Sequence, residues 1–314
     1  MHLMIRRSFS ALSRVALLTL LAACAAQPAA QPSSVPAVAK PTIVVTYAVL
    51  GSVVRELVGD SAAVLVPMAN GQDPHEWEPS AKDIEAIMQA DMVVQNGLGL
   101  EGGMEKTLEQ AKAASVKFYT AADHITVRTV GAGEGLPTGD PDQAVGAEDP
   151  HLWMDPLALK AVVESLAAQL NTDLGLDVAV RATSLSARLD ALNTELAAEV
   201  AKLPETNRKL VTGHESLGYF AQRYAFTLVG AIIPAISSQA EVSAADLAQL
   251  KQLIAQNKVK AIFTELGTPP QVAEAIGTES GVQVVELTTH SLPDDGSYFT
   301  FMRNLTAVIT KGLA

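Results

Sequence analysis

Short apolar runs rich in β-branched residues alternate with segments of helical periodicity along almost the whole chain, and this alternation constrains the fold more than any other feature. The runs predict strands at residues 42–49, 62–66, 92–95, 116–119, 209–212, 226–231, 259–264 and 282–287. The helical patterns lie at residues 53–58, 83–89, 101–114, 157–170, 217–224, 244–256, 271–279 and 298–313. Such alternation is typical of β-α units with parallel sheets, so the predicted fold class is α/β.

One segment interrupts the alternation. Residues 178–203 show apolar positions at helical spacing, with no Gly or Pro before Pro204, and therefore predict one long helix. We expect two α/β lobes with parallel sheets, residues 41–172 and 204–314, joined by a long rigid helix within residues 173–203. In such lobes ligands bind beyond the carboxyl ends of the strands, which places the expected site in the cleft between the lobes.

The N-terminus indicates export. The first 14 residues hold three arginines and no acidic residue, and an apolar run follows at residues 15–21. This is the pattern of a secretory signal peptide, predicted here for residues 1–23, and the run is too short to span a bilayer. The sequence Leu21-Ala22-Ala23-Cys24 resembles a bacterial lipobox, which implies lipidation of Cys24. An ordinary signal peptide is the alternative, but it would leave the only cysteine of the chain without a disulfide partner.

Composition limits what the remainder can do. Residues 24–40 consist mainly of Ala, Gln, Pro, Ser and Val, which predicts a disordered tether. The whole chain is 48% hydrophobic, enough to build cores, and 34 acidic against 22 basic residues make nucleic acid an unsuitable partner. No other apolar stretch has the length of a membrane span. We therefore expect a monomer, lipid-anchored to the membrane and facing the periplasm or the cell exterior.

Four of the six histidines lie where a cleft would form. His75, His151, His214 and His290 each fall in a loop where a predicted strand has ended or a predicted helix is about to begin. A neutral imidazole is a good ligand for zinc. A single loop histidine is more often a surface group, and spacings of tens of residues match no short zinc motif, so spacing alone leaves open whether the four meet.

Two of these histidines share a local pattern, Asp73-Pro74-His75-Glu76-Trp77 and Asp149-Pro150-His151-Leu152-Trp153. Proline fixes its own φ and pushes the preceding residue toward an extended conformation, so the backbone beside each histidine is stiff. A stiff backbone lowers the entropic cost of ordering a ligand. Asp73 and Asp149 have two open roles: a second-shell acceptor for the N–H of a metal-bound imidazole, or an Asx-turn.

Four motifs carry a resemblance to a known family. They are Asp73-Pro74-His75-Glu76-Trp77-Glu78-Pro79-Ser80, Asn96-Gly97-Leu98-Gly99-Leu100-Glu101, Asp149-Pro150-His151-Leu152-Trp153-Met154-Asp155-Pro156 and Thr212-Gly213-His214-Glu215-Ser216-Leu217-Gly218-Tyr219-Phe220. Together they resemble the ZnuA/TroA-type metal-binding proteins of ABC importers. The resemblance covers nearly all of the chain after the tether. It implies a binding protein rather than an enzyme, with one metal between two lobes, delivered to a permease in the membrane.

The resemblance also implies a ligand set. Three ligands carry over by motif: His75, His151 and His214. The fourth family position is commonly an aspartate shortly after the last strand, and here His290 aligns with it, with Asp295 as the runner-up and Asp294 behind. The loop before His151 is histidine-rich in many zinc-binding relatives. Here that loop contains no histidine but carries Asp140, Asp142, Glu148 and Asp149, and we interpret it as solvated.

Ligand type then favours one metal. Manganese lies at the bottom of the divalent affinity order and prefers oxygen ligands, whereas imidazoles suit zinc in a tetrahedral site. In manganese-binding members of the family the position of His214 is typically a glutamate. We therefore expect one Zn²⁺ per chain, with Mn²⁺ less favoured.

Three alternatives stay open at this point. The chain could be a manganese-specific binding protein of the same family, or an adhesin or metal chaperone that uses the same fold for cell adhesion or metal transfer. A zinc hydrolase is less favoured. His75-Glu76 and His214-Glu215 begin like a metalloprotease motif, but a proline and a glycine stand where the second histidine would be.

Overall fold

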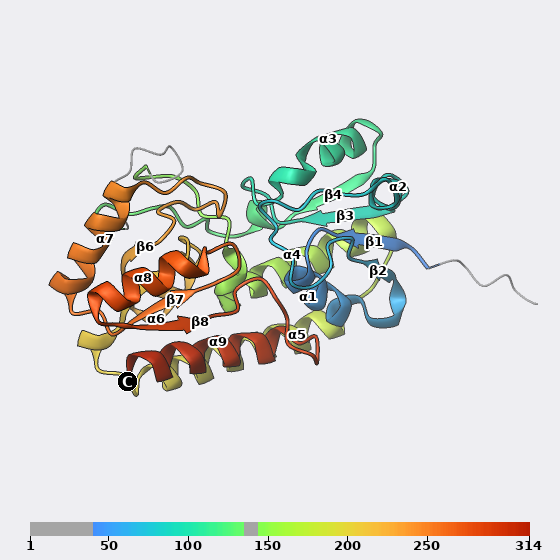
Figure 1. The fold of residues 1–314 in the computed structure, drawn as a ribbon. Helices are drawn as coiled ribbons and strands as arrows, with labels where there is room; N and C mark the ends of the chain where they lie inside the picture. Colours follow the sequence, from blue (N-terminus) through green and yellow to red (C-terminus); the bar gives the residue numbers. More distant parts are fainter. Residues whose placement is uncertain (1–39, 135–143) are drawn as a thin grey trace, which may run out of the picture. The chain divides into compact units, whose positions relative to one another are not determined.

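Four parallel strands form the sheet of the N-terminal half. The computed structural model describes residues 40–134 and 144–314. The strands are β1 (Thr42–Val45), β2 (Ala63–Leu65), β3 (Met92–Gln95) and β4 (Lys117–Thr120). Their order across the sheet is β2-β1-β3-β4, and every pairing is parallel (Figure 1). Because all the carboxyl ends meet at one edge, the loops that follow these strands lie together there.

The helices of this half begin where the sequence supplies caps. They are α1 (Ala48–Val58), α2 (Ala81–Met88), α3 (Glu105–Ala113) and α4 (Pro156–Leu174). Ser80 and Asp83 form a capping box at the start of α2, and Asp155 caps α4 ahead of a proline at the first helical position. Helix α1 begins five residues earlier than predicted, and the strand before it is correspondingly short. The apolar run through both elements has no break that marks where the strand gives way to the helix.

The C-terminal half contains two parallel strand pairs. Strand β5 (Lys209–Thr212) pairs with β6 (Thr227–Ala231), and β7 (Ala261–Thr264) pairs with β8 (Gln283–Glu286). Strands β5 and β7 lie next to each other. Three helices connect them: α6 (Gly218–Tyr224), α7 (Ala244–Asn257) and α8 (Pro270–Ser280). The parallel α/β architecture predicted from the alternation is confirmed in both halves.

Two long helices run side by side along the molecule, α5 (Ala179–Val200) and α9 (Tyr298–Leu313) (Figure 1). The buried stripe of α5 follows helical spacing and comprises Ala182, Leu185, Ser186, Leu189, Leu192, Leu196 and Val200. At the surface the guanidinium of Arg303 on α9 pairs with Glu195 on α5 at 2.8 Å. Residues 40–314 form one compact unit, and the lobe boundaries expected at residues 172 and 204 remain a prediction.

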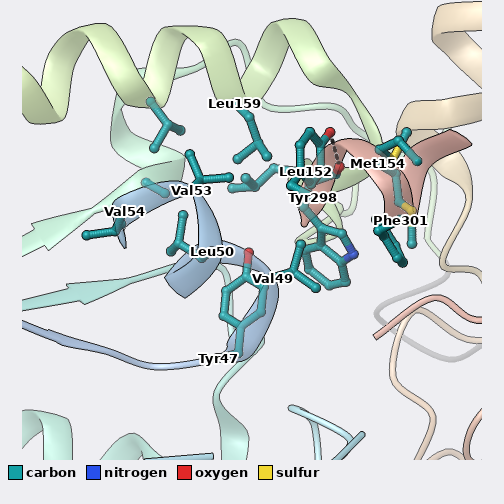
Figure 2. Packing of buried hydrophobic residues seen from close by; sticks show 14 of the residues in the cluster. Tyr47, Val49, Leu50, Val53, Val54, Leu152, Met154, Leu159, Tyr298 and Phe301 are labelled. Atoms are coloured by element: carbon teal, nitrogen blue, oxygen red, sulfur yellow. Dashed lines mark hydrogen bonds between the residues drawn. The ribbon is translucent and has the colours of Figure 1, made fainter. Parts of the chain in front are cut away.

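A buried cluster of aliphatic and aromatic side chains lies beneath the loops at the end of the N-terminal sheet. Figure 2 shows Val53 of α1 and Leu159 of α4 in this cluster, together with Tyr298 of α9. The hydroxyl of Tyr298 donates to the backbone carbonyl of Trp153 at 2.8 Å, so α9 is fixed to the 3₁₀ turn Leu152–Met154. Burial of side chains of this size stabilises by about 1.5–3 kcal/mol each. The turn directly after His151 is therefore anchored in the largest core.

Some expectations concern residues beyond those that the structure describes. The signal peptide, Cys24 and nearly all of the tether lie outside, as do Asp140 and Asp142 of the acidic loop. Within the described ranges, none of the helices combines the length and the apolar character that crossing a membrane requires.

Candidate metal centre

Four histidine side chains from distant parts of the sequence converge on one point. His75, His151, His214 and His290 each offer a ring nitrogen, and these four atoms all lie within 4.8 Å of one another. His75 lies in the segment between β2 and α2, and His214 lies two residues after the end of β5. His290 follows β8, and His151 precedes α4. All four therefore come from loops at strand ends or helix starts.

The spacing of the nitrogens fits one metal ion. The Nε2 atom of His151 lies 3.3 Å from Nε2 of His75 and 3.2 Å from Nε2 of His214. Zinc binds imidazole nitrogen at about 2.0–2.1 Å, so neighbouring ligands at tetrahedral corners are roughly 3.3–3.4 Å apart. Neutral imidazoles that turn their lone pairs toward each other repel unless a cation lies between them. Both the distances and the donor type suit a divalent ion at the centre of the cluster.

Asp149 holds His151 in two ways. One oxygen, Oδ1, lies 2.9 Å from Nδ1 of the His151 ring and also accepts the backbone N–H of His151 at 3.0 Å. The other oxygen accepts from Arg128 Nη1 at 3.0 Å, and Arg128 also pairs with Glu134. A carboxylate on Nδ1 places the proton there and leaves Nε2 free to bind an ion. Asp149 thus makes the contacts of both roles that the sequence left open, and its part in a metal site stays a prediction.

Asp73 repeats only the backbone part of this arrangement. Its Oδ1 accepts the backbone N–H of His75 at 3.0 Å, which is an Asx-turn. Its Oδ2 accepts from Ser238 Oγ at 2.6 Å, a contact that reaches the C-terminal half. The contacts of Asp73 are therefore with the loop backbone and with a hydroxyl of the C-terminal half rather than with an imidazole ring.

Glu265, at the end of β7, holds His214. Its Oε1 accepts the backbone N–H of His214 at 3.0 Å and lies 3.1 Å from Nδ1 of the same ring, at an ion-pair distance that is not aligned as a hydrogen bond. The approach requires glycine at position 213. A Cβ there would lie 2.8 Å from Glu265 Cγ and 2.0 Å from Thr268 Oγ1. Gly213 of the family-like motif therefore makes room for the carboxylate.

His290 is held through its neighbour. Thr289 Oγ1 lies 2.9 Å from His290 Nδ1 and donates its own proton to Glu265 Oε2 at 2.5 Å. The backbone carbonyl of Thr289 accepts from Trp153 Nε1 at 3.0 Å. The other ring nitrogen, His290 Nε2, is buried, and the described residues offer it no hydrogen-bond partner. A buried polar atom without a partner is costly, and an ion in the cluster would satisfy it.

Burial and neighbouring charges shift the pKa values of three of the rings in different directions. Burial, together with the nearby histidines, lowers the pKa of His75 well below its ordinary value and lowers the pKa of His290 to about 3. Burial also acts to lower the pKa of His214, but the charge of Glu265 outweighs it and the pKa is raised. Burial acts to raise the pKa of Glu265, yet the facing His214 lowers it to about 2. Glu265 is therefore ionised beside the rings.

His75 is the least buried of the four histidines. His151 and His214 are fully buried and His290 is 5% exposed, whereas His75 is only partly buried. The loop that carries His75 is fixed to the opposite half by Asn70, whose side-chain amide donates to the carbonyl of Leu292 and accepts from its N–H, both at 2.8 Å.

The remaining acidic candidates lie elsewhere. Asp294 and Asp295 are exposed. Asp295 accepts from the backbone of Ser297 at 3.0 Å and from Thr300 Oγ1 at 2.6 Å, so it supports the start of α9. Neither belongs to the group of four nitrogens.

Glu265 was predicted only as the end of a strand that resembles the family, and no role in the site was predicted for Glu265, Thr289 or Arg128. Thr289 stands directly beside His290 in the sequence, and its hydroxyl was a signal that could have been used. Glu265 lies 51 positions after His214 in the sequence, and no local pattern links the two residues.

Comparison with protein families gives one family. The model of the ZnuA family, described as "Zinc-uptake complex component A periplasmic", matches residues 43–312. This range includes all four histidines.

The names of individual relatives mention either zinc or manganese. The "Zinc-binding protein TroA" of Treponema pallidum is 30% identical over 242 residues, covering 76% of this chain and 74% of that protein. The "Manganese-binding lipoprotein MntA" of Halalkalibacterium halodurans is 25% identical over 280 residues, covering 87% of this chain and 88% of that protein. The solved structure of the periplasmic zinc-binding protein TroA from Treponema pallidum superposes with a TM-score of 0.72 at 26% identity, covering 88% of this chain and 99% of the other.

Proposed function

Because the chain belongs to the ZnuA family of zinc-uptake components, we propose that it is the substrate-binding protein of an ABC importer and that its cargo is a single Zn²⁺ ion held by His75, His151, His214 and His290. Relatives of this family are named as zinc-binding or manganese-binding proteins. Metal binding for import is therefore common to both, and the choice of zinc is the finer part of the proposal.

The observation that carries the proposal is the convergence of four imidazole nitrogens within 4.8 Å. No carboxylate belongs to this group among the described residues, so the ion would meet nitrogen at every protein ligand. Nitrogen-only coordination favours zinc over manganese, which prefers oxygen. The carboxylates of Asp149 and Glu265 lie at the Nδ1 atoms of His151 and His214, and from there they would supply negative charge without coordinating the ion.

Binding and release need no bond-breaking chemistry. The ion loses its water molecules as the neutral imidazoles replace them, and it enters and leaves past His75, the least buried ring. Because protons compete for the same nitrogens, affinity should fall as the pH drops, and the fall should begin above the ordinary imidazole pKa of about 6.5 because the pKa of His214 is raised. We further propose that Cys24, at the expected lipobox, is the membrane anchor that keeps the protein near its permease.

The test is metal analysis of protein purified without chelators, followed by competition titration with zinc and manganese. One tightly held zinc per chain, with manganese bound far more weakly, is the expected result. Stoichiometric manganese in the purified protein, or tighter manganese binding in the titration, would transfer the proposal to the manganese-binding relatives.

Other roles of the same fold remain predictions. An adhesin or metal chaperone would also bind zinc, so only the partner separates these roles from import. Zinc-dependent uptake in cells that is lost on deletion of this protein, and restored by the wild-type chain but not by a Cys24→Ser variant, would support delivery to a membrane importer.

A further inference from the structure

Glu265 contacts the backbone of His214 and the threonine next to His290, but it does not belong to the group of four nitrogens that could hold the ion. The residue is 6% exposed, and its carboxylate accepts the backbone N–H of His214, the hydroxyl of Ser216 at 2.8–2.9 Å, and the hydroxyl of Thr289 at 2.5 Å. Each of these contacts comes from a donor. The carboxylate therefore acts as an acceptor toward both loops that carry the histidines of the C-terminal half.

These contacts determine where the ring proton of His290 lies. A threonine hydroxyl has one proton, and Thr289 gives it to Glu265. Toward His290 the hydroxyl oxygen can then only accept, so Nδ1 at 2.9 Å must carry the ring proton. The neutral ring keeps its lone pair on Nε2, the buried atom without a protein partner. Glu265 is thus linked to the His290 tautomer through two successive hydrogen bonds.

We propose that Glu265 is the positioning residue that makes His290 a metal ligand, through the proton chain Glu265–Thr289–His290, and that it supports His214 by direct contact. The inference rests on the proposed function, because it assigns a role within the same zinc site. It adds a residue that acts through two histidines rather than on the ion.

The charge of the site supports this role. Four neutral imidazoles leave both positive charges of a divalent ion uncompensated in a buried place, which is costly. Asp149 supplies one negative charge behind His151. Glu265 supplies the second behind His214, with its Oε1 3.1 Å from Nδ1. The two carboxylates stand one on each half of the site, and each places negative charge behind an imidazole ring.

A Glu265→Gln variant tests the proton chain directly. The backbone N–H of His214 must still be accepted, so the amide oxygen takes the position of Oε1 and the NH₂ group faces Thr289. Thr289 then accepts from the amide and turns its proton toward His290 Nδ1. The ring proton of His290 moves to Nε2, where it blocks the ion. We expect zinc affinity to fall by about 10- to 100-fold, the usual range for loss of an outer-shell partner.

The decisive readout is the tautomer, which a merely structural role would not change. Long-range ¹H–¹⁵N NMR of the histidine rings in the zinc-loaded protein distinguishes an Nδ1 proton from an Nε2 proton. In the wild-type protein His290 should carry its proton on Nδ1, and in Glu265→Gln on Nε2. Visible spectra of the cobalt-substituted proteins should also differ. The wild type should show four nitrogen ligands, and Glu265→Gln should show water in place of His290.

Two further variants serve as controls. Glu101 is another glutamate that is 5% exposed and accepts backbone N–H groups, but its hydrogen bonds reach Thr46, Asn96 and Gly97 and no histidine. Glu101→Gln should leave zinc affinity within about twofold, less than a single hydrogen bond is worth. Thr289→Ser keeps the hydroxyl and should retain the wild-type tautomer, whereas Thr289→Val should weaken zinc binding as Glu265→Gln does.

The outcomes separate the two proposals. A wild-type protein that binds no zinc at the histidines overturns the proposed function itself. A wild-type protein that binds zinc, with Glu265→Gln matching Glu101→Gln in affinity and keeping the His290 proton on Nδ1, overturns the role of Glu265 alone.

Discussion

The two halves of the metal centre hold their histidines by the same chemical device built from different parts of the sequence. In the N-terminal half Asp73 and Asp149 each accept the backbone N–H of the histidine two residues later, both at 3.0 Å. In the C-terminal half Glu265 accepts the backbone N–H of His214, also at 3.0 Å, from 51 residues away. In each case a carboxylate accepts the backbone N–H of a histidine, and we call this hydrogen bond a clamp. The N-terminal clamps are local in the sequence, whereas the C-terminal clamp depends on the tertiary fold.

The difference has a physical consequence. An Asp-Pro-His turn needs only its own residues, so the clamps on His75 and His151 can form wherever the turn forms. The clamp on His214 exists only when β5 and β7 lie next to each other. The C-terminal histidines should therefore be more sensitive to changes in packing, and the N-terminal ones to changes in the turn itself.

The largest expected effect is the loss of a buried ligand. Zinc sites with four ligands bind with about 10–16 kcal/mol, so one ligand contributes on the order of 3 kcal/mol, or roughly a hundredfold in affinity. His214→Ala should lower zinc affinity by at least this factor, because His214 is fully buried and water cannot readily replace its ring. His75→Ala should lose less, because water can reach the partly exposed position. Competition titration against a chromophoric chelator measures both.

His124 provides the control for these two variants. It stacks on Tyr119 with ring centroids 4.7 Å apart, away from the cluster, so His124→Ala should leave zinc affinity unchanged. A weaker affinity in His75→Ala than in His214→Ala would contradict the expectation that the more buried ligand contributes more to affinity.

A second prediction compares the two aspartates of the local clamps. Asp149 contacts the ring of His151 and the guanidinium of Arg128 as well as the backbone, so Asp149→Asn would turn an amide toward one of them and should weaken zinc binding by about 10- to 100-fold. Asp73→Asn keeps the backbone acceptor, and its amide can donate to Ser238, so a loss within about threefold is expected, the value of one neutral hydrogen bond. Equal losses by calorimetry would show that the two turns are functionally alike.

The elements were largely predictable because local patterns determine them. Strand β5 lies at the predicted residues and α7 differs by one residue at its end. The capping residues Ser243 and Asp246 explain why α7 begins where it does. The start of α1 was wrong, because the preceding strand and the helix are equally apolar and burial on all sides hides the change of period.

The candidate site was predictable only in part, and the comparison of the halves shows why. The Asp-Pro-His turns are visible in the sequence, and the family resemblance supplied His214 and His290. The partners Glu265 and Arg128 act over 51 and 21 residues, and no local pattern encodes such separations. Gly218 illustrates the same limit: a Cβ there would lie 2.2 Å from Asp149 Oδ2, a constraint that appears only once α6 packs against the aspartate.

The buried glutamates of the two halves should also respond oppositely to pH. Burial raises the pKa of Glu101 above its ordinary 4.5, whereas the histidines hold the pKa of Glu265 low. The folded protein therefore retains the Glu101 proton more strongly than the unfolded chain does, so its stability falls as the pH rises above about 4.5 and levels off once the folded-state pKa is passed. Thermal unfolding of the metal-free wild type against Glu101→Gln isolates this effect, because Gln does not titrate.

The wild type should lose stability relative to Glu101→Gln across that pH window. The opposite slope would mean that the backbone N–H groups of Asn96 and Gly97 stabilise the ionised carboxylate more than burial destabilises it.

The smallest expected effect concerns the contact that joins the two halves at the entrance. Asn70 makes two hydrogen bonds with the backbone of Leu292, next to the loop of His290, and the side chain is exposed. Exposed hydrogen bonds contribute at the low end of about 0.5–1.5 kcal/mol, so Asn70→Ala should accelerate zinc release by roughly two- to fivefold and leave the association rate nearly unchanged. Stopped-flow chelator chase measures the release. An unchanged release rate in Asn70→Ala would mean that the ion leaves by a path that the loop of His75 does not control, and the partial exposure of that ring would then no longer identify the entrance.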